Sequence, residues 1–342
     1  MAIAWKNLSG HVKQLINGSY PDIGQVFYMV DSNYRTAAQG WSNAEGTGPL
    51  DLFAQYGQGA ETYVYYAPGT GQPSGVTYSR DQTAIQAAID AMTDFRGDTL
   101  FFTPGSYSIA TTALTFNVPN ARYLGPPVPT AYRSAVTITD AIGDNEVSVD
   151  NNEFAFLRFV PLTAQNFFQT ASGADFGYMH DYLYDAQGIA ASTSTEFVAG
   201  TTNEGWVIRR GVHVVDAAQG DAFALTSSTR WLWEDCDFYV ELTTVAWASV
   251  FTFLTSALGN IARRCYFRGC GGSTPAVFTN IFTGIANVNG QLMVSDCRID
   301  GTALATASDI EVTFGTTTDI EIIETFQSGD ATGQGGLAIA LA

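Results

Sequence analysis

Three of the four carboxylates in the segment WLWEDCDFYVE could act together, namely Asp235, Asp237 and Glu241. Paired carboxylates are the groups with which glycoside hydrolases protonate the leaving oxygen of a sugar bond and attack or activate water on its other side. Residues two apart on a strand point to the same face, so we expect Asp235 and Asp237 to lie together, opposite Cys236. These three residues are the candidates for catalysis on a polysaccharide.

The same carboxylates have a structural alternative. Arg264 and Asp296 follow Asp235 at one-repeat spacing, which predicts a ladder that pairs Asp235 with Arg264 and Arg264 with Asp296. Opposite charges on neighbouring strands stabilise a sheet modestly. Because the signs alternate regularly along the chain, the ladder is favoured over catalysis.

The remaining chemistry-bearing residues are few. Among the three histidines, His213 falls in a column otherwise held by apolar residues and is interpreted as a core histidine. His180, in YMHDYLYD beside Asp181 and Asp185, suits a cation site or an acid/base pair, but a polar corner loop explains it better. No cofactor is expected, and a calcium ion is an option that no motif supports.

Three of the four cysteines, Cys236, Cys265 and Cys297, recur at one position of a repeat. The absence of a CxxC pair argues against a zinc ribbon. Free cysteine packs as a small hydrophobic residue. We therefore predict a ladder of reduced, buried thiols, with a disulfide and a metal site as the less favoured alternatives.

The element that positions these residues is a repeat whose period drifts. Aligned on the cysteine column, successive segments lie 25 to 32 residues apart, as expected for one turn of a three-sided parallel solenoid. Alternating apolar positions within each segment predict strands with one buried face. The segments are WVIRRGVHV (206–214), WLWEDCDFYV (231–240), NIARRCYFRG (260–269), LMVSDCRIDG (292–301) and IEIIETFQSG (320–329). Five coils are expected here and three more between residues 97 and 204.

Residues 79–107, SRDQTAIQAAIDAMTDFRGDTLFFTPGSY, read as a short helix, a turn at Gly97, a strand and a Pro-Gly corner. The apolar positions of the helix form one narrow stripe: Ala84, Ile85, Ala88, Ile89 and Met92. This stretch resembles the N-terminal signature of pectin-lyase-like, right-handed parallel β-helix proteins. The resemblance implies an all-β, right-handed parallel β-helix of about eight coils, capped by a helix over 81–95.

The resemblance covers the scaffold rather than the chemistry. Sequences of the polygalacturonase type carry four catalytic motifs, of which only an RID at 298–300 has a match in this chain. Fold alone does not determine function. A non-enzymatic role is therefore favoured over a polysaccharide hydrolase or lyase.

Residues 1–78 lack a sustained period and are rich in glycine and proline, so we expect an irregular N-terminal arm before a β-helix at 79–342. The arm also carries aromatic residues that suit docking on a partner: Tyr34, Trp41, Phe53 and Tyr56. The end of the chain, 329–342, is expected to close the last coil.

A net charge of −18 argues against nucleic-acid binding, which needs a basic surface, and against anionic membranes. No apolar run of membrane-spanning length and no secretion signal is found, so folding in a host cytoplasm is expected. An acidic β-helix of this size resembles structural proteins of tailed-phage virions. That resemblance implies a virion location and a homotrimeric capsid decoration (cement) protein on the major capsid protein. The alternative is a tailspike that binds or cleaves polysaccharide.

Overall fold

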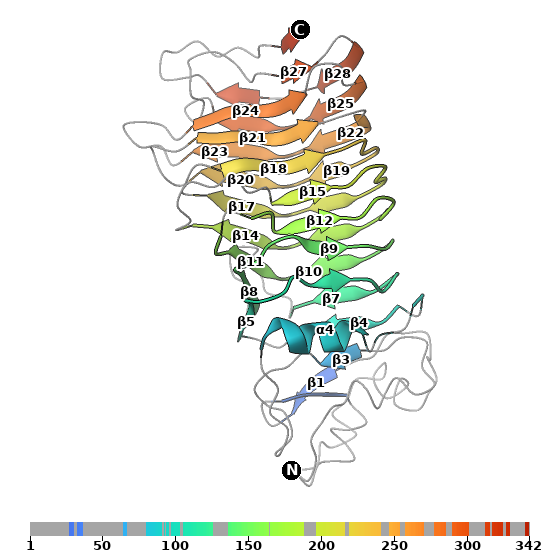
Figure 1. Cartoon of the computed structure of the whole chain (residues 1–342). Coiled ribbons are helices and arrows are strands. Elements are labelled where there is room, and N and C mark those ends of the chain that lie inside the picture. The colour runs from blue at the N-terminus through green and yellow to red at the C-terminus, as the bar shows by residue number, and fades with distance from the viewer. Residues whose placement is uncertain are drawn as a thin grey trace, which may run out of the picture.

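The computed structural model describes most of the chain between Arg80 and Asp300, together with several separate strands outside that region. The described residues are 27–30, 33–36, 64–66, 80–90, 92, 94–95, 97–102, 105–125, 136–163, 165–187, 196–215, 219–240, 246–253, 257–269, 277–284, 289–300, 312–314, 317–323, 326–328 and 339–341. They form a right-handed parallel β-helix whose strands stack in three sheets, with one helix across the first coil (Figure 1).

Sheet 1 has ten parallel strands, one above the other. They are β3 (Val64–Tyr66), β4 (Thr99–Phe101), β7 (Arg122–Leu124), β10 (Glu153–Ala155), β13 (Tyr178–His180), β16 (Val207–Arg209), β19 (Leu232–Glu234), β22 (Ala257–Arg263), β25 (Asn289–Ser295) and β28 (Thr317–Ile323).

Sheet 2 has nine parallel strands and follows sheet 1 in each coil from β4 onward. They are β5 (Gly105–Ile109), β8 (Val136–Asp140), β11 (Arg158–Pro161), β14 (Leu183–Ala186), β17 (Val212–Val215), β20 (Asp237–Val240), β23 (Tyr266–Gly269), β26 (Arg298–Asp300) and β29 (Phe326–Ser328).

Sheet 3, also of nine parallel strands, completes each coil. They are β6 (Thr115–Phe116), β9 (Asn145–Val147), β12 (Phe168–Thr170), β15 (Phe197–Ala199), β18 (Gln219–Leu225), β21 (Ala246–Phe253), β24 (Val277–Gly284), β27 (Val312–Phe314) and β30 (Ile339–Leu341). The predicted β-helix is confirmed, and its coil number differs slightly from the expected eight because sheets 2 and 3 each hold nine described strands.

Strand register confirms the columns read from the repeat. Leu292 pairs with both Asn260 and Ile320, and His213 pairs with Phe238 as Phe238 does with Phe267. Like residues therefore stack along the solenoid axis. The Phe238 and Phe267 rings are 5.1 Å apart and nearly parallel, and the Trp206 and Trp231 rings are stacked at 5.5 Å. Offset aromatic stacking adds to the stabilisation from burial.

One expectation about local structure was wrong. Each repeat segment is not a single strand but two strands of different sheets, joined by a corner. In the coil of Asp235, β19 ends at Glu234 and β20 begins at Asp237. Asp235 has φ 57°, so the left-handed conformation of this one residue turns the chain from sheet 1 into sheet 2. Asp235 and Asp237 therefore do not lie on one strand.

The helix expected at the start of the β-helix is α4 (Gln82–Asp90), shorter than the predicted 81–95. Ile85 and Ile89 are fully buried against the first coil, as the apolar stripe predicted. The Asp81 carboxylate accepts a hydrogen bond from the backbone N–H of Ala84 at 3.1 Å, which caps the first turn. Gly97 has φ 76°, in the left-handed region expected for the turn after the helix.

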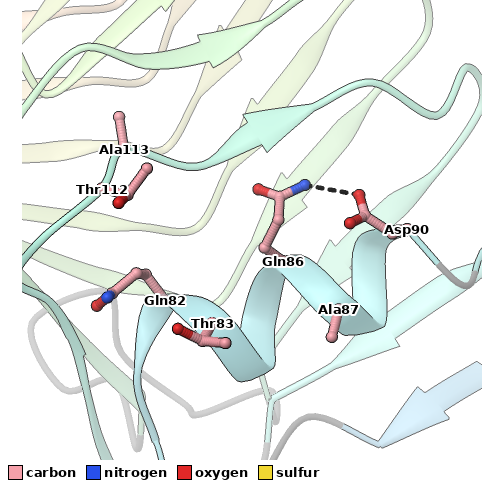
Figure 2. Close-up of a pocket in the computed structure, with 7 residues that line it drawn as sticks. All are labelled: Gln82, Thr83, Gln86, Ala87, Asp90, Thr112 and Ala113. Carbon is pink, nitrogen blue, oxygen red and sulfur yellow. Dashed lines mark hydrogen bonds between the residues drawn. The ribbon is translucent and has the colours of Figure 1, made fainter.

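Side chains of α4 close the open edge of sheet 3. The amide of Gln86 accepts from the backbone N–H of Thr115 at 2.9 Å and donates to the Thr115 carbonyl at 3.1 Å, as a neighbouring strand would do. Gln82 accepts from the N–H of Ala110 at 3.1 Å. In Figure 2 Gln86 also reaches Asp90, to which it donates at 2.9 Å. Unpaired strand edges invite aggregation, and this helix covers one of them.

The segment expected as an arm contributes described strands. The antiparallel pair β1 (Phe27–Val30) and β2 (Asn33–Thr36) contains Tyr34, and β3 extends sheet 1 beside β4. The other three docking candidates, Trp41, Phe53 and Tyr56, lie outside the described residues. Within 329–342, the described part is β30, which pairs with β27. No helix in the described part of the chain is long and apolar enough to cross a membrane.

Candidate functional site

The candidate carboxylates belong to a row of charged side chains at the corner between sheets 1 and 2. Each of four successive coils contributes the last residue of its sheet 1 strand and the corner residue after it. We call this row the corner ladder; its members are His180, Asp181, Arg209, Arg210, Glu234, Asp235, Arg263 and Arg264. The sign of the charge alternates from coil to coil. A coil that contributes an acidic residue is followed by a coil that contributes two arginines.

Glu234 is the most enclosed carboxylate of the corner ladder, with its side chain 7% exposed. It forms ion pairs with arginines of the coils on both sides: Arg209 Nε lies 3.0 Å from its Oε2, and Arg263 and Arg264 both donate to Oε1. A carboxylate held by hydrogen bonds from cations is stabilised in its charged form.

The two predicted catalytic aspartates are separated by the corner and hold different arginines. Arg264 donates from Nε to Oδ1 of Asp235 at 2.7 Å, one coil above it. Asp237 lies on β20 in sheet 2 and accepts from Arg268 Nε at 2.9 Å. Glu241, the third candidate, lies outside the described residues. The structure thus pairs Asp235 with Arg264, as the predicted charge ladder requires, and gives Asp237 a separate partner. The second predicted pair is not found, because Arg264 binds Glu234 and Asp235 and forms no ion pair with Asp296 among the described residues.

His180 ends the corner ladder toward the N-terminus. Its Nδ1 lies 2.7 Å from Asp181 Oδ2, and its Nε2 lies 3.0 Å from Oε1 of Glu153 on the preceding coil. Arg122 donates to Glu153 at 2.6 Å, and Arg210 donates to Asp181 at 2.7 Å. His180 is thus not in a corner loop but is the last residue of β13, between two carboxylates that have their own arginines.

The carboxylates of the corner ladder, and Glu153 beside it, are held ionised. Burial raises the pKa of Glu153, but hydrogen bonds from His180 and Arg122 outweigh it and lower that pKa to about 2. For Glu234 burial is likewise outweighed by Arg263 and Arg264, so its pKa is lowered. The hydrogen bond from Arg264 lowers the pKa of Asp235. A general acid of a glycosidase needs a raised pKa, so these groups are unsuited to that role.

A second acidic group lies at the corner between sheets 3 and 1. Asp150 accepts from the backbone N–H of Asp175 at 2.9 Å, and Asp175 accepts from that of Glu204 at 2.8 Å, so the three stack coil on coil. Burial, Asp150 and Glu204 raise the pKa of Asp175. Glu204 pairs with Arg230. Asp175 is the partly exposed carboxylate whose pKa is shifted in the direction that an acid catalyst needs.

His213 is a core residue, as predicted, and its partner was not foreseen. It is fully buried, and Nδ1 is hydrogen-bonded to Glu196, itself 2% exposed. Nε2 lies 3.0 Å from the hydroxyl of Tyr182. With the proton on Nδ1, His213 donates to Glu196 and accepts from Tyr182. Burial raises the pKa of Glu196, and interactions with His213 and Tyr182 oppose the rise.

The three column cysteines are free, and each is 1% exposed. They lie at the same position of successive coils: the N–H of Tyr266 donates to the Cys236 carbonyl at 2.8 Å, and the N–H of Cys265 points to Cys297 Sγ at 3.4 Å. Burial raises the pKa of Cys265. Thiols of this kind are unreactive.

A groove of about 370 Å³ lies between α4 and the loop before β6 (Figure 2). It is lined by Gln82, Thr83, Gln86, Ala87, Asp90, Thr112 and Ala113. The two glutamine amides are already engaged with the first coil, and no aromatic ring is present among these lining residues to stack on a sugar. Within the described part of the chain, no group of three histidine, cysteine or acidic residues is placed to hold a metal ion.

Sequence reasoning missed two features. The Arg209–Arg210 and Arg263–Arg264 pairs occupy the columns of Glu234 and Asp235, so the repeat alignment already contained the signal for a ladder two residues wide. Glu196 lies outside the aligned segments and carried no such signal.

Strand pairing makes this chain a right-handed parallel β-helix protein. No protein-family model matches the sequence, and no curated protein is similar to it in sequence. Solved structures that align with it include a pectin methylesterase from Aspergillus niger, at 12% identity and a TM-score of 0.45 over 81% of this chain and 91% of that one. ORF18 of Geobacillus virus E2 aligns at 11% identity and 0.34, over 93% and 68%. The Streptococcus pneumoniae surface protein and adhesin PfbA aligns at 9% identity and 0.33, over 76% and 95%. Likenesses this distant transfer no activity.

Proposed function

We propose that this protein is a non-enzymatic structural component of a tailed-phage virion, a homotrimeric decoration protein on the capsid. The observation that carries the proposal is the state of the corner ladder. Asp181, Glu234 and Asp235 are each paired with arginines of neighbouring coils, and their pKa values are lowered. Charged side chains that pair from one coil to the next favour a rigid structural body over a catalytic role.

The interior supports the same role. Aromatic rings stack on one another through successive coils, from Trp206 on Trp231 to Phe251 on Phe282 at 5.0 Å. The core cysteines are inert, and the first coil is sealed by α4. A long, rigid body that is closed at its first coil suits a protein that remains on a particle surface.

The N-terminal segment supplies the proposed attachment. It is rich in aromatic residues that a flexible linker would lack, among them Trp41 and Phe53. Buried aromatic side chains dominate the energetics of many protein interfaces. We assign this segment, including Tyr34 and Tyr56, to the contact with the major capsid protein.

Binding to capsids tests the proposal. Particles of the phage that carries the gene are prepared with the gene deleted, and purified full-length protein is added back. We expect the protein to sediment with capsids and to appear on their surface by electron microscopy. A variant with Trp41→Ala and Phe53→Ala should lose binding and keep the circular dichroism of the parent. Particles that never carry the protein, or on which it appears only at the tail, would contradict the decoration role.

The second candidate is a tailspike that binds or cleaves polysaccharide. Its specific support is Asp175, which is partly exposed, has a raised pKa and lies between Asp150 and Glu204. A carboxyl group with a raised pKa is what the general acid of a glycosidase requires. Release of reducing ends from host polysaccharide by the parent, lost in Asp175→Asn, would favour this candidate over the decoration protein.

A further inference from the structure

An apolar stripe runs along the outer face of sheet 1. Strand register places five residues one above another in successive coils, and all five are partly exposed. We call them the outer stripe: Tyr178, Val207, Leu232, Ile261 and Met293. Their chain neighbours Ile208 and Trp233 are fully buried, so the stripe faces outward. Four steps of about 4.8 Å make the stripe about 19 Å long.

Two of the large apolar side chains with the highest exposure in the described part of the chain extend this surface. Phe176 is 53% exposed and lies two residues before Tyr178, and Leu258 is 42% exposed and lies three residues before Ile261. A Cβ on Gly205 would come within 2.5 Å of the Phe176 ring, so this ring lies over the next coil, against Gly205, two residues before Val207. Exposed apolar groups that adjoin one another mark interaction surfaces more often than scattered ones do.

The outer stripe lies where the charge of this acidic protein is balanced. The chain has 15 basic and 33 acidic residues, yet six of the basic residues border this face. Each of them forms an ion pair with an acidic residue of the same face; they are Arg122, Arg209, Arg210, Arg230, Arg263 and Arg264. Two molecules that each carry a net charge of −18 repel, and the repulsion is smallest where they meet through neutral surfaces.

The chemistry of the stripe favours a protein partner over a sugar. Four of its five members are aliphatic or thioether side chains, whereas sugar-binding surfaces rely on aromatic rings. A partner that follows the stripe must also present apolar groups at the spacing of β-strands over several coils. A second copy with its axis parallel to the first does so at every coil.

We propose that copies of this chain associate through the outer face of sheet 1, with their outer stripes facing one another along parallel solenoid axes. The inference rests on the proposed function only for the number of copies, which is three. A three-fold axis parallel to the solenoid brings three identical stripes together and leaves sheets 2 and 3 on the outside of the assembly.

Matched substitutions on two faces test the interface. Val207→Glu and Leu232→Glu place a charge in the stripe, and Leu232→Ser is a milder variant that keeps the test valid if a glutamate disturbs folding. Val198→Glu is the control, because Val198 is a partly exposed valine on the outer face of β15, the strand before β16. Masses are measured by light scattering and native mass spectrometry at micromolar concentration, with circular dichroism as the check on folding.

We expect the parent and Val198→Glu to be trimers and the two glutamate variants to be folded monomers. Leu232→Ser should dissociate at least about 10-fold more readily than the parent. A monomeric parent, or glutamate variants that retain the mass of the parent, would overturn the interface. A dimer that Val207→Glu dissociates would uphold the interface and overturn the count of three. Capsid binding is measured separately, so failure of the interface and failure of the virion role are distinguishable.

Discussion

Arg264 donates from Nε to Asp235 at 2.7 Å across one coil, and both residues have left-handed backbone angles, φ 52° and φ 57°. The corner that turns the chain from sheet 1 to sheet 2 is therefore also the place where ion pairs join neighbouring coils. Aspartate adopts this conformation more readily than arginine does. The ion pairs at the corner offset part of the backbone cost that the arginines incur there.

Loss of Glu234 should loosen three coils at once. Glu234→Gln removes the charge that Arg209, Arg263 and Arg264 share, and we expect the free energy of unfolding to fall by about 1–2 kcal/mol. The control is Glu146→Gln on the outer face of β9, where the carboxylate has no ion pair among the described residues. Urea unfolding followed by circular dichroism measures both. Equal midpoints for the two variants would show that the ladder contributes nothing to stability.

Stability should fall in acid because the paired carboxylates must take up protons. The folded pKa of Glu153 is about 2, below its ordinary 4.5, so between these values the unfolded chain binds more protons than the folded one. The contribution of Glu153 is fully present above about pH 4.5 and is lost as the pH falls toward about 2. Asp181, Glu234 and Asp235 act in the same direction.

The urea midpoint measured at successive pH values checks this dependence. The parent should lose stability through the stated window, and Glu153→Gln should lose less of it, because that variant has one titrating group fewer. A midpoint that stays constant as the pH falls from about 4.5 to about 2 would contradict the role given to these ion pairs.

The repeat could be read from sequence because each coil places like residues in register. The cysteine column and the His213 column both follow the strand pairing. The corner could not be read so easily, since buried and partly exposed residues alternate from Glu234 to Phe238 as they would along one strand, although β19 ends at Glu234. Only backbone angles distinguish a straight strand from a left-handed corner. Glu196 was missed because it lies outside the aligned repeat segments, so no column of the alignment placed it beside His213.

The pair formed by His213 and Glu196 should be interdependent. His213→Phe alone matches the stacked Phe238 and Phe267 but leaves Glu196 buried without its partner, so we expect a loss of about 3–5 kcal/mol in the free energy of unfolding. Adding Glu196→Met, a substitution of similar size, should recover most of the loss. A double-mutant cycle by urea unfolding measures the coupling. Purely additive effects would show that the two side chains do not stabilise each other.

The column cysteines should react with thiol reagents only when the solenoid opens. Cys236, Cys265 and Cys297 are each 1% exposed, and a buried thiol reacts slowly because reagents in solution do not reach it. In a Cys270→Ser background these three are the only thiols, and mass spectrometry after maleimide treatment counts the labels. We expect none in the native protein and three in urea. Rapid labelling of all three without denaturant would contradict the buried ladder.

Removal of Asp235 and Asp237 should lower stability and leave any action on sugars intact. Asp235 and Asp237 are each engaged with an arginine of the next coil, Arg264 and Arg268 respectively. The lowered pKa of Asp235 keeps this carboxylate ionised, so it holds no proton to donate and is a weak base. Asp235→Ala with Asp237→Ala is compared with the parent for binding to host polysaccharide and for release of reducing ends. Asp175→Asn is the matched variant at the corner between sheets 3 and 1.

We expect the double variant to behave as the parent does in both assays and to unfold at a lower urea concentration. Cleavage that is present in the parent and absent from the double variant would assign these aspartates to catalysis after all.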